Sequence, residues 1–186
     1  MIETLRDFVA KANSLSLEYM ITGSYAMSAY GEIRMTRDID IVIHLSENKL
    51  ESFVKLFESE YYISKGSALR AIRSRSMFNI INQIHGGKID CIIQKNTPFA
   101  RESFGRRFKV SAFGIEFWTT TKEDLILAKL TWAKDTRSEM QIRDIANLTE
   151  SEYDSDYVSI WIANIDLVDI WSEVEQWKIH RDKTAN

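Results

Sequence analysis

The strongest constraint on the fold is an alternation of acidic and apolar residues in Asp-Ile-Asp-Ile-Val-Ile, residues 38–43. Isoleucines alternate with Asp38 and Asp40, which is the two-residue period of a β-strand that buries one face. Both carboxylates therefore leave the same face, with their backbones roughly 6.5–7 Å apart. Two neighbouring acids repel each other unless a cation lies between them, and Mg²⁺ prefers such oxygen ligands. The pattern predicts a metal-binding strand.

A Gly-Ser pair, Gly23-Ser24, precedes this strand and follows an apolar run, residues 17–21, that reads as a first strand. A glycine lets the backbone approach a phosphate closely, and free N–H groups and the serine hydroxyl can bind its oxygens. The alternative is an ordinary strand-to-helix turn in which Ser24 is the N-cap. The two interpretations are compatible, so the pair remains a candidate phosphate-binding turn.

Size and composition favour a single globular domain, with room for a small helical extension. The chain has 186 residues, a net charge of −3 and one cysteine, Cys91, which excludes an internal disulfide and fits a reducing compartment. No run approaches the roughly 18 apolar residues that a membrane helix needs, and the charged N-terminus is unlike a secretory signal. We therefore expect a cytoplasmic protein that does not contact a membrane.

The remaining periodicities predict alternating helices and strands. Glycines and the Thr120/Glu123 pair, a capping-box pattern, mark several boundaries. The expected elements are a helix at 2–14, a strand at 38–44, a helix after Ser46, a less regular stretch at 61–76, strands at 77–83 and 88–93, a hairpin at 108–113 and 115–119, helices at 123–134 and 138–148, and a final helix pair containing Trp161, Trp171 and Trp177, which we expect in the core or at a partner contact.

The Gly23-Ser24 pair followed by Asp38-x-Asp40 resembles the signature of the nucleotidyltransferase-fold superfamily. Arg34 and the Arg37-Asp38-Ile39-Asp40 segment add a pattern similar to the AbiEii-like, toxin-associated branch. The resemblance implies an α/β fold in which a small mixed β-sheet is flanked by helices and followed by a helical C-terminal part. It places the nucleotidyltransferase core at residues 1–120 and a helical part, packed on that core, at 121–186.

The resemblance also implies a chemistry: transfer of a nucleoside monophosphate from an NTP such as ATP to a hydroxyl or phosphate acceptor, with two Mg²⁺ ions. Asp38 and Asp40 would bind metal, and Asp90, on the strand 88–93, matches the third metal-site carboxylate and a possible base. The competing interpretation is structural: Asp38 caps a turn and Asp40 pairs with Arg34 or Arg37.

Basic residues supply the remaining candidate contacts with the nucleotide. Arg34 and Arg37 flank the acids, and Lys129 stands between two large apolar residues on its predicted helix. Asp144 belongs to an Arg-Asp-Ile-Ala-Asn-Leu segment that resembles the same branch, although Asn147 replaces an acid that is common there. Each residue taken alone is also a candidate for an ordinary salt bridge. Six further arginines are candidates for a polyanion-binding patch, with a solvated face as the alternative: Arg70, Arg73, Arg75, Arg101, Arg106 and Arg107.

The toxin-associated resemblance implies tRNA or a protein as acceptor, in a toxin–antitoxin or phage-defence system with a cognate antitoxin. A small-molecule acceptor, as in antibiotic-modifying members of the superfamily, is the close alternative. A non-catalytic module with this fold that binds a partner protein is the rival from another class. The sequence predicts neither the identity of the NTP nor the oligomeric state.

Overall fold

The computed structural model describes residues 1–32, 36 and 38–184. Strands and helices alternate in the first two thirds of the chain, and helices alone follow. In chain order the elements are α1 (Ile2–Ser14), β1 (Tyr19–Thr22), α2 (Gly23–Met27), the 3₁₀ turn η1 (Ser28–Tyr30), β2 (Asp38–Ile43), α3 (Glu47–Phe57), β3 (Tyr61–Ile63), α4 (Lys65–Ser74), β4 (Met77–Asn82), β5 (Lys88–Ile93), α5 (Pro98–Gly105), β6 (Phe108–Ala112), β7 (Ile115–Thr119), α6 (Lys122–Thr136), α7 (Glu139–Leu148), α8 (Ser155–Asn164) and α9 (Val168–Thr184).

The seven strands of the described ranges form one mixed sheet in the order β3-β4-β5-β2-β1-β7-β6. β2 lies near its centre, antiparallel to β1 and parallel to β5, while β1 pairs in parallel with β7. The other neighbours are antiparallel, including the predicted β6–β7 hairpin around Gly114. This confirms the predicted α/β class with a mixed sheet flanked by helices, and it carries the acidic strand into the interior of the sheet.

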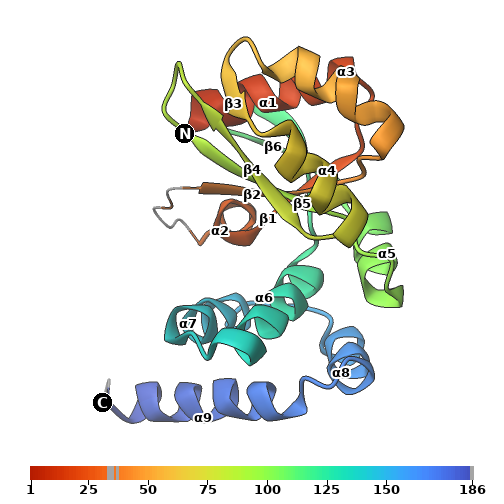
Figure 1. Ribbon diagram of the computed structural model, residues 1–186. Helices are drawn as coiled ribbons and strands as arrows, with labels where there is room; N and C mark the ends of the chain where they lie inside the picture. The colour runs from red at the N-terminus through yellow and green to blue at the C-terminus, as the bar shows by residue number, and fades with distance from the viewer. Residues whose placement is uncertain (33–35, 37, 185–186) are drawn as a thin grey trace. The chain divides into compact units, whose positions relative to one another are not determined.

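The apolar side of β2 explains why the sheet forms around it. Its exposure alternates residue by residue: the three isoleucines are fully buried, whereas Asp38, Asp40 and Val42 are partly exposed. The isoleucines pack with side chains of α1, α3 and α4, and Figure 1 shows α1 and α3 on one side of the sheet and α2 on the other. The two faces of β2 therefore differ in role, since one is core and the other carries the acids.

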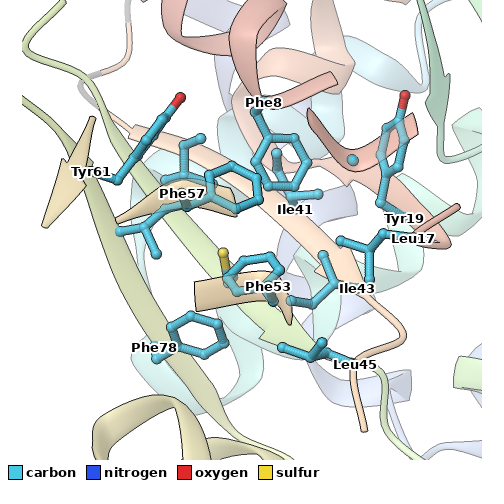
Figure 2. Packing of buried hydrophobic residues seen from close by; sticks show 14 of the residues in the cluster. Phe8, Leu17, Tyr19, Ile41, Ile43, Leu45, Phe53, Phe57, Tyr61 and Phe78 are labelled. Carbon is cyan, nitrogen blue, oxygen red and sulfur yellow. The ribbon is translucent and has the colours of Figure 1, made fainter. Parts of the chain in front are cut away.

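Aromatic side chains fill the core on the helix-covered face. Phe53 and Phe57 of α3 stack at a centroid distance of 4.6 Å, and Phe57 also meets Phe8 at 5.5 Å and Tyr61 at 5.2 Å (Figure 2). Contacts of this kind contribute about 0.5–1.5 kcal/mol each beyond simple burial. The core thus fixes β2 from one side and leaves its acidic side to the opposite face.

The helices α6–α9 make a second group with its own buried residues. Leu125, Leu130 and Ile145 are fully buried, and the helix α6 begins at the N-cap Thr121, whose hydroxyl accepts from the backbone N–H of Asp124 at 3.2 Å. Asp124 is itself buried and accepts the Tyr157 hydroxyl at 2.7 Å. No helix in the described part of the chain is long and apolar enough to cross a membrane.

Compactness divides the chain into two units. The first comprises Met1–Ala29 and Ile33–Thr120, and the second comprises Tyr30–Glu32 and Thr121–Asn186. The division thus falls between Thr120 and Thr121, with one short segment from the N-terminal part in the second unit. The acidic strand and the Gly-Ser turn belong to the first unit.

Several local expectations were wrong. The stretch 61–76 is not irregular, because it forms β3 and α4. Ser64 caps α4 by accepting from the N–H of Ser67, and Ala68 and Ala71 bury its inner face; small alanines give a weak apolar stripe, so the helical period is hard to read. The capping residue of α6 is Thr121 rather than Thr120.

The tryptophans of the C-terminal helices are less buried than the core residues. Trp132 of α6 is 55% exposed, whereas Leu125 and Lys129 on the same helix are buried. Trp161, Trp171 and Trp177 of α8 and α9 are half-buried, unlike the fully buried isoleucines of β2, and a contact with a partner stays a prediction for them.

Candidate functional site

The Gly23-Ser24 turn and the acidic strand meet at Asp40. Gly23 opens α2 with φ +62°, a left-handed conformation that favours glycine. A Cβ built on Gly23 would lie 2.0 Å from Oδ2 and 2.8 Å from Cγ of Asp40, so the carboxylate occupies the space that any side chain here would need. Antiparallel pairing of Thr22 with Asp40 sets this approach. Both the positive φ and the close approach of Asp40 therefore require a glycine at position 23. The Asp40 carboxylate lies directly against the Gly-Ser turn.

The strand register brings Asp38 and Asp90 to the same face as Asp40. β2 and β5 pair in parallel with Asp38 opposite Lys88 and Asp40 opposite Asp90. Residues that face each other in a ladder point to the same side of the sheet. The Asp90 side chain is 10% exposed, and that of Asp38 is 35% exposed. The three predicted acids thus occupy one sheet face next to the Gly-Ser turn.

An ammonium group lies between two of these acids. Nζ of Lys88 is 2.6 Å from Oδ2 of Asp38 and 3.2 Å from Oδ2 of Asp90. The hydrogen bond to Asp38, and then the bond to Asp90, raise the pKa of Lys88 against the opposing effect of burial. Lys88 therefore stays charged and balances part of the negative charge of the face.

The acids fit a divalent ion in their chemistry. All three donate hard carboxylate oxygens, and Oδ1 of Asp90 is buried without a hydrogen-bond partner among the described residues. A buried charged oxygen without a partner is costly, and a cation would satisfy it. Among the described residues, no group of three or more Asp, Glu, His or Cys side chains lies close enough together to hold a metal ion as the structure stands. Among the described residues, the cation in contact with both Asp38 and Asp90 is the Lys88 ammonium.

The predicted pair Lys129 and Asp144 belongs to the second unit. Nζ of Lys129 is 2.8 Å from Oδ2 of Asp144 and 3.1 Å from Oε1 of Gln141, and the two charged side chains are 4% and 3% exposed. The pair joins α6 to α7. Its predicted contact with the nucleotide stays a prediction, and the structure adds a second role for the pair, as a buried link between two helices.

Other predicted residues are distributed as follows. Ser24 lies in the first turn of α2 and is half-buried. Arg34 and Arg37 lie outside the described residues, so their predicted contacts with the acids or with phosphate remain predictions.

Two of the arginines considered as a polyanion patch are neutralised locally. Arg73 donates two hydrogen bonds to Glu47, at 3.0 and 3.1 Å, and Arg107 donates to Glu18 at 3.0 Å. Paired in this way, they offer less charge to a nucleic-acid backbone.

Sequence reasoning missed two residues of this face. Lys88 stands two positions before Asp90 in the same strand, so the two-residue period already puts its side chain on the acid face. Asn79 of β4 lies directly opposite Asp90 in the antiparallel ladder and is exposed. The two-residue period was therefore sufficient to predict the position of Lys88. The position of Asn79 depends on the β4–β5 register, which cannot be predicted from the sequence of either strand alone.

The geometry can be compared with proteins of known structure. The chain is similar to an antigenic nucleotidyltransferase-like protein from Paracoccidioides brasiliensis, at 18% identity and a TM-score of 0.55 over 90% of this chain and 88% of that one. It is also similar to ANT(2")-Ia, whose structure holds adenylyl-2"-tobramycin, at 12% identity and a TM-score of 0.54 over 94% and 97% of the two chains. The lincosamide antibiotic adenylyltransferase LnuA, bound to lincomycin, gives 12% identity and a TM-score of 0.53 over 80% and 96%.

These likenesses show a nucleotidyltransferase-like fold. No curated protein matches the sequence. A family model does match, over residues 2–166, and its description is Nucleotidyltransferase of unknown function (DUF6036). With Asp40 at the Gly-Ser turn and a sheet of the corresponding fold, the chain belongs to this nucleotidyltransferase family.

Proposed function

We propose that the protein transfers a nucleoside monophosphate from an NTP, with ATP as the first candidate, to a hydroxyl group of a small-molecule acceptor. The observation that carries the proposal is the Asp40 carboxylate at Gly23, with Asp38 and Asp90 in register on the same face. A nucleotidyltransferase needs acidic groups for a divalent ion beside a phosphate-binding turn, and we assign these tasks to the three acids and to the Gly-Ser turn.

The groups we assign to a divalent ion are Asp38, Asp40 and Asp90. When bound, an ion such as Mg²⁺ neutralises triphosphate charge and helps to orient the α-phosphorus for in-line attack. The unpartnered Oδ1 of Asp90 supports this assignment, because a buried carboxylate oxygen without a partner costs free energy that a bound cation would offset.

The chain's own groups have separate tasks in the transfer. We assign Gly23 and Ser24 to bind phosphate oxygens through the backbone N–H groups of the turn and the serine hydroxyl. The acceptor oxygen attacks the α-phosphorus, the bond from that phosphorus to the bridging β-oxygen breaks, and pyrophosphate leaves. We assign Asp90 to receive the proton of the attacking hydroxyl. Arg34, Arg37, Lys129 and Asp144 remain proposed nucleotide contacts.

A small acceptor is favoured over tRNA by the charge of the described surface. The net charge is −3, and Arg73 and Arg107 are already paired with glutamates. Of the proteins of similar fold, LnuA is a lincosamide antibiotic adenylyltransferase, and the antibiotic-resistance factor ANT(2")-Ia is found in complex with adenylyl-2"-tobramycin, which is consistent with a small hydroxylated acceptor. A tRNA or protein acceptor in a toxin–antitoxin or phage-defence system, with a cognate antitoxin, is the competing proposal.

A non-catalytic partner-binding module is disfavoured by the same acids. A site without turnover gains nothing from a mostly buried carboxylate with an unpartnered oxygen, since asparagine or an apolar residue would avoid its cost. The left-handed conformation of Gly23 is a second cost that such a module has no reason to keep.

The direct test is transfer of label from each α-³²P-NTP, with Mg²⁺, to a panel of aminoglycosides, lincosamides and bulk tRNA. The comparison is between the native chain and the double variant Asp38→Asn plus Asp40→Asn. Losing several kcal/mol of charge stabilisation should reduce transfer by at least about 100-fold. Equal labelling by both proteins, or none by either with any acceptor, would contradict the proposal. Transfer to tRNA that falls steeply with salt would replace the small acceptor by RNA.

A further inference from the structure

A side chain of this protein already occupies the position between two of the acids that we assign to metal. Nζ of Lys88 contacts Oδ2 of Asp38 at 2.6 Å and Oδ2 of Asp90 at 3.2 Å. The contact follows from the fold, because the parallel register sets Lys88 opposite Asp38 and two residues before Asp90 on one face. It is therefore a built feature of the β2–β5 ladder.

The ammonium and a divalent ion compete for Oδ2 of Asp38 and Oδ2 of Asp90. Each oxygen that coordinates Mg²⁺ lies within about 2.0–2.1 Å of the ion, and two cations at such close quarters repel each other strongly. Lys88 is free to leave, since its side chain is 35% exposed and a lysine stem is long and flexible. The two cations are thus alternatives at Asp38 and Asp90.

We propose that Lys88 is a resident cation that holds Asp38 and Asp90 together before metal binds and that a divalent ion must displace it. This inference rests on the proposed function, because it concerns the same metal site. Lys88 is then a positioning residue with a regulatory effect. Its ammonium reduces the repulsion between Asp38 and Asp90 when no metal is bound, and it lowers the affinity of the site for a divalent ion. Once displaced, the ammonium is available to other anions at the site.

The test compares Mn²⁺ binding, measured by electron paramagnetic resonance of free Mn²⁺, in the native chain, Lys88→Met and Lys88→Arg. Two partly exposed charge contacts must be broken in the native chain, so Lys88→Met should bind Mn²⁺ about tenfold more tightly or better. Lys88→Arg keeps the charge and should bind no more tightly than the native chain. Lys49→Met, which removes an exposed lysine from α3 on the opposite face, should bind like the native chain.

Thermal unfolding gives a second readout that needs no activity. In EDTA, Lys88→Met should melt at a lower temperature than the native chain, because its acids repel one another, and saturating Mn²⁺ should raise its melting temperature by more. Lys88→Gln, closer in length and polarity, replaces Lys88→Met if the latter does not fold.

The outcomes separate the two proposals. Equal Mn²⁺ affinity in the native chain and Lys88→Met, with binding lost in Asp38→Asn plus Asp40→Asn, would overturn the displacement and leave the proposed function standing. Absence of Mn²⁺ binding in all variants would overturn the metal site and with it the inference. Tighter Mn²⁺ binding by Lys88→Met, with no such change in Lys88→Arg or Lys49→Met, supports both the metal site and the displacement of Lys88.

Discussion

Replacing Gly23 with alanine should disable the site through two effects whose sizes follow from the structure. Gly23 has φ +62°, where a residue with a Cβ loses about 1–2 kcal/mol. The new Cβ would lie 2.0 Å from Oδ2 of Asp40, whereas non-bonded heavy atoms settle at about 3.5–4.0 Å. The Asp40 carboxylate must therefore move by about 1.5 Å or more.

The two effects predict different readouts. The backbone strain should lower the free energy of unfolding by about 1–2 kcal/mol and the melting temperature by about 2–8 °C. The displaced carboxylate should weaken Mn²⁺ binding and reduce nucleotidyl transfer by about 100-fold, since misplacing a positioned group by 1 Å can cost that much.

Gly114→Ala is the matched control. Gly114 also has a left-handed φ, +72°, but nothing lies within 4 Å of a Cβ placed there. This variant should lose a similar amount of stability and keep Mn²⁺ affinity and transfer. Differential scanning calorimetry and Mn²⁺ titration of both variants decide the matter. If Gly23→Ala binds Mn²⁺ as tightly as Gly114→Ala, the reasoning about Asp40 is refuted.

Two further predictions concern buried groups. Lys129→Met should lower the free energy of unfolding by about 3–5 kcal/mol in urea titrations, because it leaves the Asp144 carboxylate buried without its cation. Adding Asp144→Leu should recover most of that loss, and a single variant as stable as the native chain would contradict a structural role for the pair. Burial raises the pKa of the Cys91 thiol above its ordinary 9.0, so only the unfolded chain ionises there as pH rises. Stability should therefore be unaffected by this group below about pH 9 and fall by about 1 kcal/mol between pH 9 and 10, a decline that Cys91→Ala should lack; an equal decline in both proteins would count against it.

The sequence was most informative where one local periodicity predicts both the secondary structure and the candidate functional residues. In β2 the same alternation that buries the isoleucines exposes Asp38 and Asp40, so strand, face and candidate ligands follow from one pattern. The mixed sheet and the helical C-terminal part were predicted from the resemblance and from such periods.

What could not be predicted depends on pairing between distant segments. The register that sets Lys88 against Asp38, and Asn79 against Asp90, arises from strands whose order is fixed by the whole sheet. The role of Lys129 shows the same limit. Its helical position suggested solvent, function or an ordinary salt bridge, but the partner, Asp144 at 2.8 Å on the next helix, is not identifiable from the period of α6.

Binding of a divalent ion by the acids of β2 at the Gly-Ser turn is best tested by anomalous diffraction from crystals grown with Mn²⁺ and a non-hydrolysable NTP analogue. We expect a manganese peak within coordinating distance of the Asp38 and Asp40 carboxylates, with phosphate density over Gly23 and Ser24. A fully occupied nucleotide with its manganese bound away from these two carboxylates would contradict it.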